Sequence, residues 1–215
     1  MKYKTYKAKE IFYTLQGEGA QAGRAAVFLR FTGCNLWSGR EEDRLKAICK
    51  FCDTDFWGTD GENGGIYSAT ELAEKVASLW PDLSEGKPYV VCTGGEPLLQ
   101  LDDPLINKLH QRGFEIAVET NGTIPAPAGV DWICVSPKAD AKVVQTTGDE
   151  LKLVFPQVET FAQPERFAHL DFQHFFLQPL DGPNTTKNTE ACVAYCLKNP
   201  KWKVSLQTHK ILAIP

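Results

Sequence analysis

Phe28-Leu29-Arg30-Phe31-Thr32-Gly33-Cys34 is a mostly apolar run that leads directly into a cysteine. It belongs to a predicted strand, Ala25–Phe31, and similar runs recur along the chain. The other predicted strands cover Glu115–Thr120 and residues 89–93, 132–136, 150–155, 175–178 and 204–208. Several are continuously apolar, which favours a parallel sheet covered on both faces. Because such folds place chemistry at the carboxyl ends of their strands, Cys34 is a candidate functional residue.

Helix signals lie between the predicted strands. Ser68-Ala69-Thr70-Glu71 has the pattern of a capping box, and apolar residues recur at helical spacing from there to Pro81. Asp103-Pro104 is predicted to cap and open a second helix that stops at Gly113, and residues 189–197 form another. The alternation predicts an α/β fold with right-handed crossovers. About six strand–helix units are too few for a closed eight-stranded barrel, so a partial, open parallel β/α barrel and a doubly wound sheet both fit.

Composition and charge exclude several classes of protein. The 215 residues are 43% hydrophobic, which suits a single domain, residues 1–215, with a substantial core. The net charge of −4 argues against a nucleic-acid partner, because no basic surplus is available to neutralise phosphates. The apolar runs are too short to span a bilayer, and no signal-type segment follows the basic N-terminus. These features predict a cytoplasmic protein with no membrane partner.

Three of the seven cysteines fall in an irregular segment rich in glycine and charge, residues 33–67. Fourteen residues separate Cys34 from Cys49, and two separate Cys49 from Cys52. The two thiolates of a Cys-x-x-Cys pair can bind one metal centre, and a thiolate at the end of a strand can be its third protein ligand. A four-iron cluster normally takes four cysteines, so three would leave one iron open for a substrate. Spacing alone fits a structural zinc site equally well, and two buried thiols with an accidental third cysteine remain an alternative.

The other four cysteines have simpler explanations. Cys92 and Cys134 lie within apolar strands and are expected to be packed core thiols. Cys192 and Cys196 share one face of a predicted helix, which we expect to be a buried face and not a second metal site. The odd total also argues against a complete disulfide framework.

Motifs outside the cysteine segment connect the chain to a known family. Thr93-Gly94-Gly95-Glu96-Pro97 follows an apolar strand and, with the three cysteines, makes the chain similar to the radical S-adenosylmethionine superfamily. The fourteen-residue gap departs from the superfamily's usual shorter spacing. With this wider gap and three further motifs, the chain resembles the 7-carboxy-7-deazaguanine synthase family. The resemblance covers nearly the whole chain. The three motifs are Leu15-Gln16-Gly17-Glu18-Gly19, Cys52-Asp53-Thr54 and Gln178-Pro179-Leu180-Asp181-Gly182.

The resemblance implies an activity, cofactors and partners. The reaction would be the radical ring contraction of 6-carboxy-5,6,7,8-tetrahydropterin to 7-carboxy-7-deazaguanine, a carbon–nitrogen lyase step that releases ammonia in queuosine and 7-deazapurine biosynthesis. The cofactors would be a 4Fe–4S cluster, S-adenosylmethionine and Mg²⁺. A reduced cluster would cleave S-adenosylmethionine to a 5′-deoxyadenosyl radical that takes a hydrogen atom from the pterin. The partners would be the small-molecule substrate, an external electron donor of the flavodoxin or ferredoxin type, and a second copy in a homodimer.

The resemblance also implies the roles of individual residues, with no catalytic side chain beyond the cluster and cosubstrate. Cys34, Cys49 and Cys52 would ligate the cluster and Thr54 the magnesium ion. S-adenosylmethionine would contact Phe51, Asp53, Gly94, Gly95, Glu96, Ser136, Lys138, Gln178 and Asp181. The pterin would contact Leu15, Gln16, Gly17, Glu18, Arg30, Thr93, His209 and Pro215. Two further residues at a strand end, Glu119 and Asn121, fit the site and fit an ordinary strand-to-turn boundary equally well.

Several of these residues have an alternative, purely structural explanation. Arg30 lies in an apolar strand and needs an anionic partner, which would be the pterin carboxylate or a structural salt bridge. His209 is either a pterin contact or a strand histidine bonded to backbone. Thr54 and its neighbouring aspartates would also cap a turn. Glu18 would also be an ordinary solvated loop carboxylate, and Gly94-Gly95 would also form an ordinary turn. The apolar C-terminal segment is expected to pack, with the Pro215 carboxylate reaching the substrate.

Two other functions remain open at this point. One is another small radical enzyme, such as an activase that makes a glycyl radical on a partner protein. The other is a zinc-stabilised binding module with no radical chemistry. The expanded cysteine spacing and the Leu15–Gly19 stretch favour the deazaguanine synthase over the activase.

Overall fold

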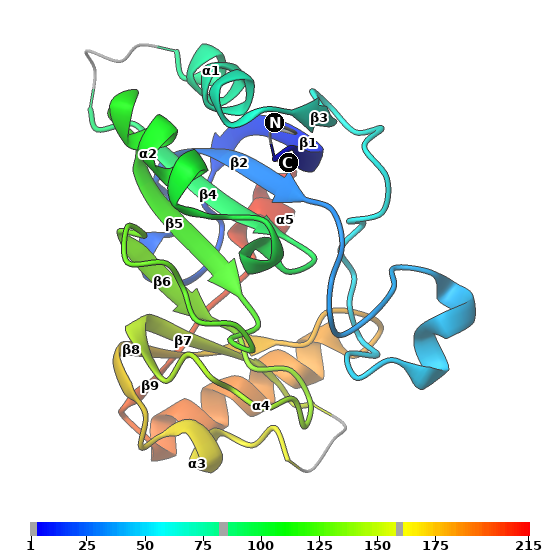
Figure 1. Cartoon of the computed structure of the whole chain (residues 1–215). Helices are drawn as coiled ribbons and strands as arrows, with labels where there is room; N and C mark the ends of the chain where they lie inside the picture. The colour runs from blue at the N-terminus through cyan, green and yellow to red at the C-terminus, as the bar shows by residue number, and fades with distance from the viewer. Residues whose placement is uncertain (1–3, 82–85, 158–160) are drawn as a thin grey trace.

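One nine-stranded sheet runs through the computed structural model, which describes residues 4–81, 86–157 and 161–215 (Figure 1). The strands are β1 (Tyr6–Leu15), β2 (Ala25–Phe31), β3 (Gly65–Tyr67), β4 (Tyr89–Gly94), β5 (Glu115–Thr120), β6 (Trp132–Val135), β7 (Thr147–Phe155), β8 (Asp171–Pro179) and β9 (Trp202–Val204). Their order across the sheet is β3-β1-β2-β4-β5-β6-β7-β8-β9. From β2 to β9 all neighbours are parallel, whereas β1 is antiparallel to both β2 and β3. The two edge strands differ, so the sheet is open.

Four helices cover one face of this sheet. They are α1 (Ala69–Leu79), α2 (Asp103–Gln111), α3 (Pro164–Phe167) and α4 (Thr185–Lys198). α1 and α2 share a core cluster with β2, β4 and β5, and α3 and α4 share a second with β6, β7 and β8 (Figure 1). A doubly wound sheet would carry helices on both faces. The prediction of a partial, open β/α barrel is therefore confirmed over the doubly wound alternative.

Alternation along the strands sorts side chains between the helix-covered face and an inner face. In β2, Val27 and Leu29 join the core beneath α1 and α2, so Arg30 points to the inner face. The same two-residue period places further polar side chains on the inner face, near the carboxyl ends of their strands. They are Thr93, Glu119, Lys152 and Gln178. The inner face therefore collects polar groups from five parallel strands.

The predicted capping box at the start of α1 is confirmed. The hydroxyl of Ser68 accepts from the backbone N–H of Glu71 at 3.3 Å, and the Glu71 carboxylate accepts from the backbone N–H of Ser68 at 2.8 Å. Both bonds satisfy donors that the first helical turn leaves without intrahelical partners. Within the described ranges, no helix has both the length and the apolar character needed to cross a bilayer.

Three predictions about individual elements are wrong in detail. The strand predicted at residues 204–208 is displaced: β9 is Trp202–Val204, and a short helix, α5 (Thr208–Leu212), begins where the strand was expected to end. Asp102, not Asp103, caps α2, because its carboxylate accepts from the N–H of Leu105 at 3.3 Å. α4 begins at Thr185, earlier than predicted. The antiparallel strand β1 was not predicted.

Candidate active site

A cavity of about 600 Å³ opens on the inner face at the carboxyl ends of the parallel strands. Its lining contains every residue predicted for the cluster, the magnesium ion, the cosubstrate and the pterin, with the single exception of Glu96. The lining also contains Glu119 and Asn121. Residues from all parts of the sequence therefore converge on one site, although the role of each residue within it stays a prediction.

The three predicted cluster ligands reach the cavity from two segments. Cys34 follows β2, and Cys49 and Cys52 follow a short 3-10 helix, η2 (Glu41–Lys46). A hydrogen bond between the thiols of Cys49 and Cys52 lowers the pKa of Cys52 to about 6 and raises that of Cys49. Burial raises the pKa of Cys34. The nearby Lys138 ammonium adds to the lowering of the Cys52 pKa, which favours a thiolate there, and at Cys49 it opposes the larger upward shift without reversing it.

The donor set fits an iron–sulfur cluster better than a single ion. Across the described residues, no three His, Cys, Asp or Glu side chains converge closely enough to hold one metal ion. A tetrahedral zinc site requires such convergence, whereas a four-iron cluster takes one thiolate on each of several irons. Free thiols at Cys34, Cys49 and Cys52, facing one cavity, meet the second requirement.

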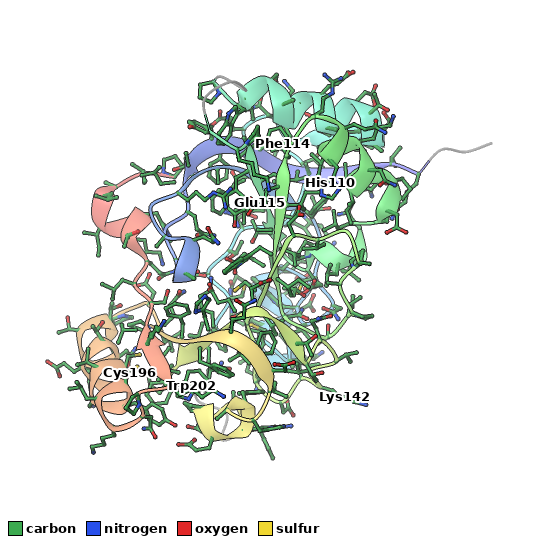
Figure 2. The ribbon with its side chains drawn as sticks, turned by 90° about the vertical axis from the view of Figure 1, so that its left-hand side faces the viewer. His110, Phe114, Glu115, Lys142, Cys196 and Trp202 are labelled. Atoms are coloured by element: carbon green, nitrogen blue, oxygen red, sulfur yellow. The ribbon has the colours of Figure 1, made fainter. Side chains whose placement is uncertain are left out.

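The remaining cysteines lie outside the cavity lining. Cys92 and Cys134 are buried in the sheet, and Cys192 is buried on the core-facing side of α4. Cys196, labelled near Trp202 in Figure 2, packs against the core cluster that contains Trp202. The expectation of packed thiols and a buried helix face is confirmed for these four residues.

Gly94 and Gly95 allow the end of β4 to approach the cysteine segment closely. A Cβ atom at Gly94 would overlap the backbone of Phe31, and one at Gly95 would overlap the carbonyl of Gly33. Gly94 also has φ of 130°, a conformation that favours glycine. These glycines therefore fix the position of Cys34 relative to β4, in addition to the cosubstrate contact predicted for them.

Glu96 is fully buried and already has partners within the chain. Its carboxylate accepts from the N–H of Leu98 at 3.0 Å, the hydroxyl of Thr120 at 2.8 Å and the N–H of Asn121 at 2.8 Å. These bonds tie the turn after β4 to the end of β5. Its predicted contact with the methionine ammonium stays a prediction, and the geometry gives Glu96 a structural role beside it.

The predicted pterin loop is attached to the inner face by its polar side chains. The amide of Gln16 donates to Glu119 at 3.2 Å. One carboxylate oxygen of Glu18 accepts from Gln178 at 3.0 Å and from Gln207 at 2.9 Å. Glu18 is therefore not a solvated loop carboxylate, and it links the loop to β8 and to the segment before α5.

Lys152 is the charged centre of this network and was missed at the sequence level. Its side chain is 3% exposed and its ammonium pairs with Glu18 at 2.7 Å and Glu119 at 2.9 Å. Burial opposes the ionisation of Glu18, but the charge and hydrogen bond of Lys152 lower the pKa of Glu18 to about 2. The signal was present: a lysine between two leucines in an apolar strand needs acidic partners, by the same argument applied to Arg30.

Arg30 has an acidic partner in the structure. Its Nε donates to Glu10 of β1 at 2.7 Å, and its side chain, 20% exposed, lines the cavity. The structural salt bridge considered as an alternative is thus present. Because that contact uses Nε, the outer edge of the guanidinium is still compatible with the predicted pterin contact.

The C-terminal segment closes the cavity through α5. His209 lies on this helix and not on a strand, and burial lowers the pKa of its imidazole. An oxygen of Pro215 accepts from the hydroxyl of Thr14 at 3.0 Å, and Pro215 lines the cavity. Lys210, also missed at the sequence level, pairs with Asp53 at 3.1 Å and Asp181 at 2.5 Å. Two predicted cosubstrate residues are thereby joined.

Known proteins match the sequence of this chain over nearly its whole length. A 7-carboxy-7-deazaguanine synthase from Caulobacter vibrioides is 68% identical over 212 residues, which cover 98% of this chain and all of the relative. The chain belongs to the 7-carboxy-7-deazaguanine synthase family. A member from Bordetella pertussis is 61% identical over 98% of this chain and 99% of its own length. The family is a radical S-adenosylmethionine family, so membership carries a 4Fe–4S cluster and that cosubstrate.

Solved structures agree with the family at the level of the fold. The crystal structure of QueE from Escherichia coli matches with a TM-score of 0.69 and 25% identity, over 94% of this chain and 93% of that one. No protein-family model matches the chain.

Proposed function

We propose that this chain is a 7-carboxy-7-deazaguanine synthase, which contracts the ring of 6-carboxy-5,6,7,8-tetrahydropterin with loss of ammonia. The product would enter queuosine and 7-deazapurine biosynthesis. The observation that carries the proposal is that three free cysteines and residues 15–18 line the same cavity of about 600 Å³. That volume lies in the range of small-molecule sites. Relatives named 7-carboxy-7-deazaguanine synthase, which match nearly the whole chain, also support the proposal.

The cluster and S-adenosylmethionine, when bound, supply the electron and the carbon radical that removes a hydrogen atom from the substrate. The chain's part is to hold and orient them, because two bound partners react fast only when their geometry is fixed. Cys34, Cys49 and Cys52 are the proposed cluster ligands. The proposed cosubstrate contacts are Phe51, Asp53, Gly94, Gly95, Glu96, Ser136, Lys138, Gln178 and Asp181.

The pterin has two ends with different chemistry, and the cavity offers a matching group for each. Its amide and amino edge presents N–H donors, which suit the acceptor oxygens of Glu119 and Gln16. Its carboxylate suits the guanidinium of Arg30 and the imidazole of His209. Leu15, Gly17, Glu18, Thr93 and Pro215 complete the proposed pterin site.

The remaining parts of the proposal concern the metal ion, partners and location. Thr54 lines the cavity, and Mg²⁺ needs few protein oxygens when waters and substrate oxygens complete its shell. A flavodoxin- or ferredoxin-type protein would supply electrons, a homodimer would be the working form, and the cytoplasm would be the location. Family resemblance supports these four points.

A product assay tests the function directly. The purified chain, reconstituted anaerobically with iron and sulfide, is incubated with the pterin, S-adenosylmethionine, a reductant and Mg²⁺, and the products are separated by mass. We expect 7-carboxy-7-deazaguanine and ammonia, with S-adenosylmethionine re-formed after each turnover, because the product radical takes the hydrogen atom back. Cleavage of S-adenosylmethionine that is indifferent to the pterin would favour the activase alternative. A colourless protein with zinc and no iron or sulfide would end the radical proposal.

A further inference from the structure

The fourteen residues between Cys34 and Cys49 form a folded insert. The backbone N–H groups of Ile48 and Cys49 donate to the carbonyl of Leu36, at 3.0 and 3.4 Å. The insert therefore returns to the point at which it left, with η2 at its far end. The two ends of the insert, Leu36 and residues 48–49, are therefore hydrogen-bonded to each other despite its length.

The Cys-x-x-Cys segment that follows lacks the support of regular structure. Residues 49–56 belong to no helix or strand. Nη1 of Arg44, on η2, donates to the carbonyl of Lys50 at 2.9 Å and to that of Cys52 at 3.1 Å. One side chain from the insert thus binds two carbonyls of the segment, one of them belonging to Cys52 itself.

The guanidinium of Arg44 is itself held in place on two sides. Its Cζ atom lies 4.1 Å from the ring centroid of Trp37, which is 7% exposed and packs edge-on against buried Phe56. Its Nε donates to Glu41 at 2.7 Å, one helical turn earlier. A planar, forked group with five donors can stack, pair and bind two carbonyls at once, whereas a lysine ammonium cannot.

We propose that Arg44 is a positioning residue for the iron–sulfur cluster, which fixes the backbone between Cys49 and Cys52 so that both thiolates face the cavity. The inference rests on the proposed function only in requiring a cluster at these cysteines. The insert thereby has a structural role, because it carries the arginine that replaces the missing regular structure. The positive charge also lies beside a ligand backbone, where it raises the reduction potential of the cluster.

The test compares three variants of the reconstituted full chain. Arg44→Gln removes both the charge and the fork, and Arg44→Lys keeps the charge without the fork. Arg40→Gln is the matched control, because Arg40 lies on the same insert and its Cζ lies 4.6 Å from the ring centroid of Trp57, but, in the described part of the chain, its side chain has no hydrogen bond or ion pair with residues 49–52. Iron and sulfide content, the rate of iron loss to a chelator, the electron paramagnetic resonance signal and the potential of the cluster are measured.

Arg44→Gln should lose iron about tenfold faster than the wild type and shift the resonance signal, because charge-assisted hydrogen bonds to the segment are lost. Its potential should fall. Arg44→Lys should also lose iron faster but keep a potential near that of the wild type, and Arg40→Gln should match the wild type in all four measurements. Arg44→Lys keeps the test valid should the glutamine variant fail to fold.

Equal iron retention and an unchanged signal in both Arg44 variants would overturn the inference, as would the same losses in Arg40→Gln. A wild-type chain that binds no cluster would instead remove the proposed function, so the two failures are distinguishable.

Discussion

The imidazole of His209 occupies the space that a side chain at Gly17 would require. A Cβ atom built at Gly17 overlaps the ring and the Cβ atom of His209. The carbonyl of Gly17 also accepts from the N–H of Thr208 at 2.9 Å and from its hydroxyl at 3.0 Å. The backbone of the predicted pterin loop therefore packs directly against the His209 side chain of the C-terminal helix and is hydrogen-bonded to Thr208.

Gly17→Ala should force α5 away from the loop. We expect the KM for the pterin to rise at least about tenfold, because a displacement of roughly an ångström at a positioned group costs that much or more. Thermal unfolding should show destabilisation of about 1–3 kcal/mol, the usual cost of overpacking. In a His209→Gly background the same substitution should destabilise much less, since the overlapping atoms are gone. An equal effect in both backgrounds would contradict the packing relationship.

Lys152→Met should be among the most damaging single substitutions in the chain. It leaves the half-buried carboxylates of Glu18 and Glu119 without their cation, and breaking one side of a buried ion pair costs up to roughly 3–5 kcal/mol. Urea unfolding measures this loss. Lys203→Met, at an exposed position on β9, should change stability by less than about 0.5 kcal/mol. Similar effects of the two substitutions would show that the Lys152 network is not stabilising.

Acid should destabilise the chain partly through Glu18. Its folded-state pKa of about 2 lies below its ordinary value of 4.5, so it contributes stability above pH 4.5 that is lost as the pH falls toward 2. Glu18→Gln should therefore flatten the stability profile in that window. Glu42→Gln is the control, because the Glu42 side chain is 74% exposed, and its stability profile should match that of the wild type. Parallel profiles for Glu18→Gln and the wild type would refute this assignment.

The cysteine assignment is testable by iron content. Alanine at Cys34, Cys49 or Cys52 should reduce the iron bound after reconstitution to less than about a tenth of the wild-type amount, because each thiolate supplies one attachment of the cluster. Cys196→Ala should retain the full amount, since Cys196 lies outside the cavity lining. Iron loss from Cys196→Ala alone would place the cluster elsewhere.

The magnesium proposal depends on a single hydroxyl. Thr54→Ala should lose at least about tenfold in turnover at limiting Mg²⁺ and recover in excess, because one oxygen ligand is missing from the shell. Thr54→Ser keeps the oxygen and should titrate like the wild type. The measurement is turnover against magnesium concentration after chelator treatment, and a titration of Thr54→Ala that coincides with the wild type would remove Thr54 from the site.

Local patterns were sufficient to predict most of the fold. Continuous apolar runs identified six of the parallel strands, and the capping pattern at Ser68 placed the start of α1. β1 was missed because its Tyr6–Leu15 sequence mixes lysines and a glutamate with apolar residues, as befits an antiparallel strand near a sheet edge. The C-terminal helix was missed because five residues carry too little periodicity to distinguish a helix from a strand.

The sequence by itself determined the elements, the order of the motifs and the family, because these depend on short-range patterns and on residues fixed within a few positions of each other. Only the tertiary structure decided which charges share the cavity. Lys152 meets Glu18, and Lys210 joins Asp53 to Asp181. Partners brought together by a sheet that folds across the whole chain leave no mark in local spacing, since their distance is set by strand order and side-chain alternation.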